Sequence, residues 1–191
     1  VELGAVMARM HDQATAWTPP AGFKRHALDE DGLMGSTPFW GPFWDHLIFS
    51  AAERDLMLAT RATLRAALLR YGKAPHVYSM IHADLHPKNV VIGDGSAAVI
   101  DFDDAGFGWH VYDLAVALVA YERHPHFTAF RDACLAGYRA VRPLAEADAA
   151  LLPMFLLVRN LAQIGWYHQR PELPPAPGLP ALKQAVCSAA A

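Results

Sequence analysis

The chain has 191 residues, of which 53 % are hydrophobic and 18 % are charged, and its formal net charge is -3. This composition indicates a globular protein with an apolar core and excludes a disordered chain. It also lacks the excess of basic residues that a nucleic-acid-binding surface needs. The two cysteines, Cys134 and Cys187, lie far apart, which argues against a disulfide framework and favours a reducing compartment.

The apolar runs and the start of the chain bear on where the protein resides. No basic stretch followed by an apolar one opens the sequence, so no signal peptide is predicted. The longest apolar runs, Leu114–Tyr121 and Ala149–Val158, are too short to cross a bilayer. We therefore expect a cytoplasmic protein that binds neither membrane nor nucleic acid.

The first part of the chain is predicted to form two helices around an irregular segment. Residues 3–13 carry apolar side chains at steps of three and four: Leu3, Val6, Met7 and Met10. No capping residue precedes them, so we interpret the chain as beginning inside a helix of a longer protein. Residues 17–42, rich in Pro, Gly, Asp and Trp, should be irregular. A second helix is predicted from Pro42 to about Arg70 and should end at Gly72. Its expected apolar face comprises Leu47, Ala51, Leu58, Ala62 and Leu69.

Short strands follow in the middle of the chain. Val77–His82 is predicted to be a strand, and Asn89–Ile92 and Ala97–Phe102 should form a hairpin. The residues between the hairpin strands are typical of a tight turn: Gly93, Asp94, Gly95 and Ser96.

The last part of the chain is predicted to be helical again. Helices are expected over 111–121, 126–141 and 146–169, the last with a kink at Pro153. The first of them is apolar on nearly all sides and should be buried. Five prolines between residues 171 and 180 predict an extended tail. The whole pattern predicts an α+β, mostly helical fold with a small central β-hairpin element.

Polar residues with chemical potential gather between residues 82 and 113. Residues 82–89 read HADLHPKN, which fits H-x-D-x-x-x-x-N, the spacing of a kinase catalytic loop. Twelve residues after Asn89, an apolar strand ends at Asp101, which begins the run DFDD. Phosphoryl transfer needs a carboxylate near the attacking hydroxyl and oxygen ligands for Mg²⁺. A short loop followed by a hairpin can bring these groups together.

The stretches HADLHPKN and VIDFDDAGFGWHVYDLA resemble the signature of the aminoglycoside phosphotransferase and choline/homoserine kinase-like superfamily. The opening LGAVMARMHDQ resembles the helix that follows the nucleotide hinge in that superfamily. The resemblance covers most of the chain from residue 3 to about 170. It implies the C-terminal lobe of a protein kinase-like fold.

Matched position by position, the resemblance implies a role for each polar residue of this region. Asp84 would be the catalytic base that positions the substrate hydroxyl, and His82 would brace the loop from behind. Asn89 and Asp101 would bind Mg²⁺. Asp113 would hold the backbone of the catalytic loop, although an aspartate also suits a helix start on dipole grounds alone.

Four further residues of this region are candidates for auxiliary roles. His86 lies two residues after the base, where protein kinases often carry a lysine near the transferred phosphate. A protonated His86 could make that phosphate contact, with Lys88 as the other candidate. Asp103 and Asp104 either help to hold a metal ion or are simply solvated.

The groups that grip ATP are not found in this sequence. None of the four lysines follows a Gly-rich turn on an apolar strand, and there is no phosphate-binding loop. In the superfamily these groups belong to an N-terminal lobe, which would precede Val1. We therefore expect residues 1–170 to form the catalytic lobe without its ATP-binding lobe, and residues 171–191 to form a Pro-rich segment and tail.

The resemblance implies an ATP- and Mg²⁺-dependent transfer of the γ-phosphate to a hydroxyl of a small molecule. The chain by itself is expected to be incomplete for catalysis. The surface left exposed by the absent lobe is expected to support self-association into a homodimer.

Two other functions remain open from the sequence. His82, Asp84 and His86 could supply ligands of a metal-dependent hydrolase, completed by further histidines such as His76 and His110. That arrangement leaves the spacing of Asn89 and Asp101 unexplained. The second alternative is a non-catalytic module that binds a metabolite.

Overall fold

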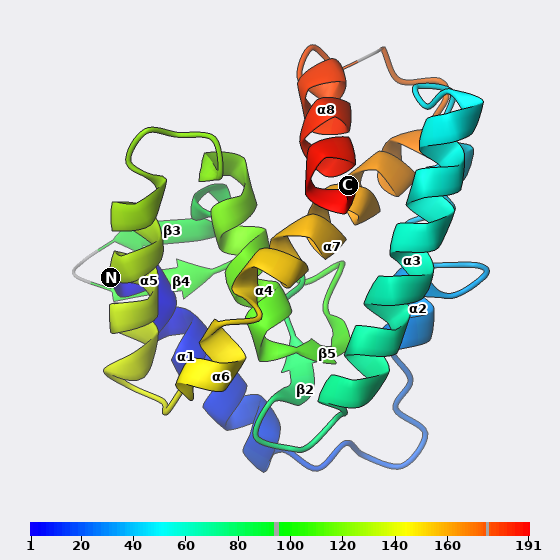
Figure 1. Cartoon of the computed structure of the whole chain (residues 1–191). Coiled ribbons are helices and arrows are strands. Elements are labelled where there is room, and N and C mark those ends of the chain that lie inside the picture. The colour runs from blue at the N-terminus through cyan, green and yellow to red at the C-terminus, as the bar shows by residue number, and fades with distance from the viewer. Residues whose placement is uncertain (94–95, 175) are drawn as a thin grey trace. The chain divides into compact units, whose positions relative to one another are not determined.

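The computed structural model of the chain describes residues 1–93, 96–174 and 176–191. The contacts divide these residues into two compact units. Unit 1 comprises Val1–Ala27 and Lys73–Leu156, and unit 2 comprises Leu28–Gly72 and Leu157–Ala191. Figure 1 shows the fold and labels its helices and the strands β2 to β5. The central residues of the predicted hairpin turn, Asp94 and Gly95, lie outside the described residues.

In unit 1, helix α1 (Glu2–Ala16) packs against α5 (Phe127–Arg139). The helices approach closely because Gly4 of α1 faces the backbone of α5 and Gly137 of α5 faces the backbone at Val1. The buried face of α1 comprises Gly4, Ala5, Val6, Met7, Ala8 and His11. Leu3 and Met10, expected on that face, are only partly buried. Val6 and Met7 are buried as expected, and small residues and His11 complete the face.

Two small sheets lie in unit 1 beside these helices. Strand β2 (Tyr78–Ile81) pairs antiparallel with β5 (Gly106–Trp109), and the two-residue β1 (Ala27–Leu28) lies on the other side of β5. Strands β3 (Val90–Gly93) and β4 (Ser96–Val99) form the predicted hairpin. Strand β4 ends three residues earlier than expected, and β5 was not predicted because its two glycines suggest a turn.

Helix α4 (His110–Leu118) forms the centre of unit 1, and every one of its residues is buried. It continues into a short 3₁₀ turn, η3 (Val119–Tyr121). Trp109 and Tyr112 pack against Phe155, with ring centroids 5.8 and 6.5 Å apart. The prediction of a buried helix over 111–121 is confirmed as far as Leu118, whereas none of the residues of η3 is buried.

Unit 2 is built from helices around aromatic and ionic contacts. Its elements are α2 (Glu30–Met34), the 3₁₀ turn η1 (Phe43–Asp45), α3 (Ala51–Tyr71), the part of α7 (Leu152–His168) after Leu156, and α8 (Leu179–Ala190). Arg61 donates to the carbonyls of Met34 and Gly35 and lies over the ring of Trp44. These contacts join α3 to the segment that was expected to be wholly irregular.

The start and the apolar face of α3 differ from the prediction. Ser50 and Glu53 form a capping box, so the helix begins at Ala51 rather than at Pro42. A hydrogen bond from Lys183, followed by those from Ser50, lowers the pKa of Glu53 to about 2. Leu47 is almost fully exposed. The buried residues of the helix are instead Met57, Thr60, Leu64 and Leu68, none of which belongs to the predicted face. Gly72 ends the helix as expected, with a φ of 74°.

The last helices also differ from the prediction. The expected helix over 146–169 is divided into α6 (Glu146–Ala149) and α7, with Pro153 in the first turn of α7, where proline is tolerated. Residues 179–190, expected to belong to a tail, form α8, which carries Pro180 in its first turn.

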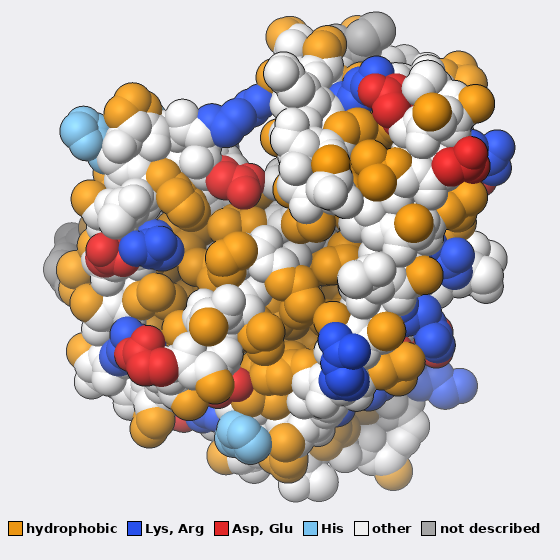
Figure 2. All heavy atoms as spheres, viewed as in Figure 1, with side chains coloured by type: hydrophobic (Ala, Val, Ile, Leu, Met, Phe, Trp, Pro, Cys, Tyr) orange, Lys and Arg blue, Asp and Glu red, His pale blue; other side chains and the backbone are white. Residues whose placement is uncertain are grey.

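By length and hydropathy alone, the stretch Glu146–His168 could cross a membrane, although the expected apolar run was shorter. Half of its most apolar window is buried inside the fold, and core helices often pass the same test. On the face drawn in Figure 2, acidic and basic side chains are interspersed among apolar ones.

The close approach of α1 and α5 can be tested with Gly4→Ala. In a helix, alanine is normally more favourable than glycine by about 1 kcal/mol. At Gly4, however, a Cβ atom would clash with the carbonyl oxygen of Cys134, which is backbone and cannot move aside. We expect a net loss of about 2 kcal/mol in the free energy of unfolding, as for an overpacked core.

Urea unfolding of the chain measures this loss, and Gly178→Ala is the matched control. A Cβ atom at Gly178 would meet nothing within 4 Å. The free energy of unfolding of Gly178→Ala should fall by less than about 1 kcal/mol, a loss that comes only from the poorer N-cap of α8. Equal stability of the two variants would show that α1 and α5 do not depend on the glycine contact.

Candidate active site

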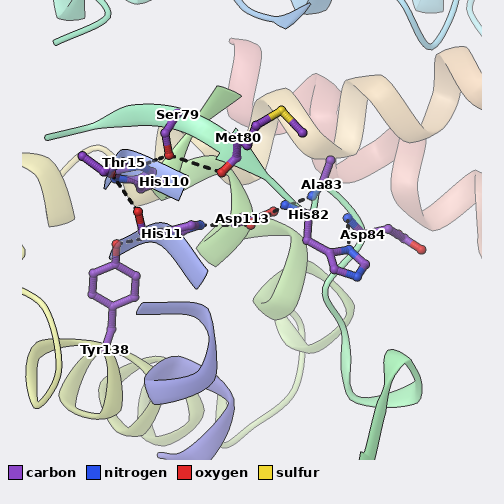
Figure 3. Close-up of polar contacts among 10 residues, drawn as sticks. All are labelled: His11, Thr15, Ser79, Met80, His82, Ala83, Asp84, His110, Asp113 and Tyr138. Atoms are coloured by element: carbon purple, nitrogen blue, oxygen red, sulfur yellow. Dashed lines mark hydrogen bonds and ion pairs between the residues drawn. The ribbon is translucent and has the colours of Figure 1, made fainter. Parts of the chain in front are cut away.

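The loop with the kinase-like spacing lies in unit 1, directly after β2. It runs through residues 82–86 into the short 3₁₀ helix η2 (Pro87–Asn89) and then into β3. Asp113, in the first turn of α4, lies next to the start of this loop (Figure 3). The site is therefore assembled from the end of a strand, a loop and the start of a buried helix.

Asp113 binds the loop through its backbone. Its Oδ1 accepts the amide N–H of Ala83 at 2.7 Å, and its Oδ2 accepts that of His82 at 3.0 Å. Ala83 has a φ of 65°, a left-handed conformation that costs an alanine about 1–2 kcal/mol. Hydrogen bonds to a charged group contribute about 1.5–3 kcal/mol each. The two bonds to Asp113 therefore outweigh the strain and hold the turn immediately before Asp84.

Asp84 and Asn89 form one hydrogen-bonded unit. The Nδ2 atom of Asn89 donates to the backbone carbonyl of Asp84 at 2.9 Å and to its carboxylate Oδ2 at 3.2 Å. Asn89 is buried, whereas the Asp84 side chain is 24 % exposed. Because Nδ2 is engaged, the carbonyl oxygen Oδ1 of Asn89 is the atom that can face a cation, and that is the atom type Mg²⁺ prefers.

Ile100 brings the second acidic motif to this loop. Its amide N–H donates to the carbonyl of Asn89 at 3.0 Å, and its carbonyl oxygen lies 3.0 Å from Nε2 of His82. Asp101 follows directly, exposed and with a φ of 66°. The two contacts of Ile100 place Asp101 beside Asn89, although twelve residues separate them in sequence.

His82 is fully buried and joins three parts of the site. Its Nδ1 accepts the amide N–H of Asp84 at 3.3 Å, so its Nε2 carries the proton and donates to Ile100. Its ring also packs against Phe102, with centroids 4.7 Å apart. Both ring nitrogens are thus engaged in holding the loop and the second motif together.

The remaining candidate residues lie around this core. Nε2 of His86 is 3.5 Å from Oδ2 of Asp84, and its buried Nδ1 has no hydrogen-bond partner among the residues that the structure describes. Lys88 is exposed on η2. Asp103 is exposed, and the backbone carbonyl of Asp104 contacts Nε2 of His26 at 3.1 Å.

The structure does not support a zinc site of the hydrolase kind. Among the described residues, no three His, Cys, Asp or Glu side chains are grouped closely enough to hold a metal ion. His82 uses both ring nitrogens as described above. His110 has its Nε2 at 2.9 Å from the hydroxyl of Ser79, away from the loop.

Sequence reasoning missed the residues behind Asp113. Nε2 of His11 lies 3.1 Å from Oδ2 of Asp113, and Nδ1 of His11 lies 2.8 Å from the hydroxyl of Tyr138 (Figure 3). One signal was available: His11 continues the buried stripe of α1 at Gly4, Met7 and Ala8. A histidine on such a face needs a buried polar partner.

The chain matches known proteins over nearly all of its length. It is 36 % identical over 159 residues to the homoserine kinase of Methylobacterium radiotolerans. The aligned region covers 80 % of this chain and 46 % of that kinase. The solved structure of a microcompartment-associated aminopropanol kinase is 34 % identical and superposes with a TM-score of 0.81, over 98 % of this chain and 57 % of that one.

A second solved structure is similar to this chain in fold. An amicoumacin kinase solved in complex with AMP-PNP, Ca²⁺ and Ami is 24 % identical, with a TM-score of 0.78, over 98 % of this chain and 58 % of that one. These neighbours confirm the predicted α+β, mostly helical, kinase-like fold. The chain spans about half the length of the curated relatives it matches.

The sequence model of one family, described as the phosphotransferase enzyme family (APH), matches residues 1–151. The match includes the whole loop from His82 to Asn89, Asp101 and Asp113. The chain therefore belongs to the phosphotransferase enzyme family.

Proposed function

We propose that this chain supplies the base and the metal-binding residues of an ATP-dependent phosphotransferase that acts on a hydroxyl of a small molecule. The observation that carries the proposal is the Asp84–Asn89 unit. One amide group of Asn89 holds the backbone and the carboxylate of Asp84, and it leaves a carbonyl oxygen for a cation. A base and a metal ligand are thereby fixed relative to each other.

In this proposal, Asp84 accepts the proton of the attacking hydroxyl. Its carboxylate is partly exposed and can be reached by a substrate, and its Oδ2 is oriented by Nδ2 of Asn89. Orienting the attacking oxygen is a large part of what a phosphotransferase has to do, because the reaction needs little other covalent chemistry. His82 and Asp113 act by holding the loop rather than by touching the substrate.

Asn89 and Asp101 would hold a divalent cation, with Asp103 or Asp104 as auxiliary acidic groups. When bound, the cation would neutralise charge on the phosphates of ATP. The amicoumacin kinase of similar fold was solved with Ca²⁺ and AMP-PNP, which supports a nucleotide and a divalent cation for this fold. Mg²⁺ is our choice of metal because it is usually held by one or two protein oxygens together with substrate phosphates.

His86 is proposed to contact the transferred phosphate. Its side chain is partly exposed, and its Nε2 lies 3.5 Å from Oδ2 of Asp84, beside the proposed base. Lys88, exposed on the same short helix turn, is the second candidate for this contact.

The acceptor proposed here is a small amino alcohol. Two relatives at 34–36 % identity are named for homoserine and aminopropanol, and each of those molecules carries a hydroxyl and an amino group. A panel of small amino alcohols, assayed for ATP consumption, tests the choice. Turnover on sugars or choline alone would contradict it.

We propose that the ATP-binding lobe is supplied outside these 191 residues, because the family resemblance implies that such a lobe precedes the catalytic lobe. Four large apolar side chains are exposed on the β3–β4 hairpin and just after it: Val91, Ile92, Ile100 and Phe102. Such a lobe, or a second copy of the chain, could pack against them. Activity should therefore be measured on the longer protein that carries the chain together with that lobe.

Asp84→Asn tests the base. The change keeps the shape and the partners of the side chain but removes its ability to take a proton. Turnover should fall by about 10²–10⁴-fold, as expected for loss of a positioned general base, with little change in ATP affinity. Asp132→Asn, at an exposed position of α5, is the matched control. Near-normal turnover in Asp84→Asn would remove the catalytic assignment.

The metal site can be tested on the chain itself, without turnover. Mn²⁺ prefers the same oxygen ligands as Mg²⁺, and it broadens the NMR signals of nearby nuclei. Added Mn²⁺ should broaden the amide signals of Asn89 and Asp101 first. Asp101→Asn should weaken this effect more than Asn89→Ala, because it removes a charge, and Asp55→Asn on α3 should leave it intact. Equal broadening in all variants would place the cation elsewhere.

A further inference from the structure

Behind the site, a line of buried side chains runs from α5 through α1 to Asp113 of α4 (Figure 3). The hydroxyl of Tyr138 lies 2.8 Å from Nδ1 of His11, and Nε2 of His11 lies 3.1 Å from Oδ2 of Asp113. All three residues are at most 1 % exposed. None of the roles described so far uses Tyr138 or His11.

This line ends on an oxygen that the catalytic loop also uses. Oδ2 of Asp113 accepts the amide N–H of His82 at 3.0 Å, so His11 and the loop share one acceptor atom. Oδ1 is occupied by the amide of Ala83. The direction in which the carboxylate points is therefore set jointly by His11 and by the two loop amides.

The surroundings of His11 fix where its proton lies. An ionised carboxylate can only accept hydrogen bonds. Because Nε2 of His11 faces the carboxylate of Asp113, Nε2 must carry a hydrogen and donate it. In a neutral ring Nδ1 is then the acceptor, and the hydroxyl of Tyr138 donates to it. Burial raises the pKa of the Tyr138 hydroxyl, so this donor keeps its proton. The opposite tautomer would set a lone pair against the carboxylate.

His110 stacks on His11 and fixes the plane of its ring. The two ring centroids are 4.3 Å apart and the planes differ by 17°. Burial, the largest cause, lowers the pKa of His110 to about 2, so His110 is neutral. Its Nε2 is held 2.9 Å from the hydroxyl of Ser79 on β2. The His11 ring is thus restrained by a hydrogen bond at each nitrogen and by a stacked neighbour.

We propose that Tyr138 is a positioning residue for the loop that carries Asp84. Its hydroxyl holds His11 as the neutral form protonated at Nε2, and this form aims Oδ2 of Asp113 at the amide of His82. With Asp113 in this orientation, its carboxylate accepts the amides of His82 and Ala83 and stabilises the left-handed turn at Ala83. The effect on turnover rests on the proposed role of Asp84 as the base, but the hydrogen-bond arrangement does not.

Tyr138→Phe removes the hydroxyl and keeps the ring. Without that donor, Nδ1 of His11 is left unpaired, and the His11 ring can turn or take up a proton. Asp113 then shifts relative to the loop, and Asp84 is misaligned. Because Tyr138 is two side chains away from the loop, substrate binding should be unaffected. We expect kcat to fall between about tenfold and about a hundredfold with KM unchanged, as for small misplacements of a catalytic group.

The first measurement needs no activity. NMR of the unaltered chain labelled with ¹⁵N at histidine reports which nitrogen of His11 is protonated, and the proposal requires Nε2. In Tyr138→Phe the amide signals of His82 and Ala83 should move. They should stay in place in Tyr121→Phe, the matched control, whose ring packs against Phe130 on the same unit.

The outcomes separate this proposal from the proposed function. Protonation of His11 at Nδ1 in the unaltered chain overturns the proposal, even where Tyr138→Phe does not fold. Unmoved amides of His82 and Ala83 in a folded Tyr138→Phe overturn it as well. A raised KM with unchanged kcat would do the same, since it would place Tyr138 in substrate binding. If no acceptor is phosphorylated by the longer protein, the proposed function fails while the NMR result still decides the positioning role.

Discussion

The candidate site depends on one buried carboxylate, that of Asp113. A buried carboxylate is unfavourable unless its oxygens are fully hydrogen-bonded. Here they accept the amides of His82 and Ala83 and face Nε2 of His11. In return, the carboxylate stabilises a left-handed alanine that would otherwise be strained. The same contacts that satisfy Asp113 thus set the direction in which the chain leaves β2 and presents Asp84.

The second motif is brought to the loop by backbone contacts rather than by its own side chains. Ile100 is bonded to Asn89 through its amide and to His82 through its carbonyl. The β3–β4 hairpin brings Ile100 back to the loop, and Asp101 follows it with a left-handed backbone. These hydrogen bonds to Ile100 therefore position the next residue, Asp101, which is exposed.

The sequence predicted the parts of the site that lie close together in the chain. The spacing of Asp84 and Asn89 sufficed because a five-residue separation allows few geometries, and their hydrogen bonds agree with it. The contacts of His11 could not be predicted, because its partners lie 102 and 127 residues away. The start of α3 was missed since the capping box at Ser50 outweighs the proline eight residues earlier. Strand β5 was missed because pairing with β2, not propensity, makes Gly106–Trp109 extended.

The central claim is that Asp113 holds the loop at His82 and Ala83. Amide hydrogen exchange in Asp113→Asn, compared with the unaltered chain, tests it most directly. An asparagine side chain has one acceptor oxygen where the aspartate has two, and it lacks the charge. The account predicts that the amides of His82 and Ala83 exchange much faster in the variant, while the amides of the α4 interior remain protected. Unchanged protection at both loop amides, in a variant that is otherwise folded, would contradict the account.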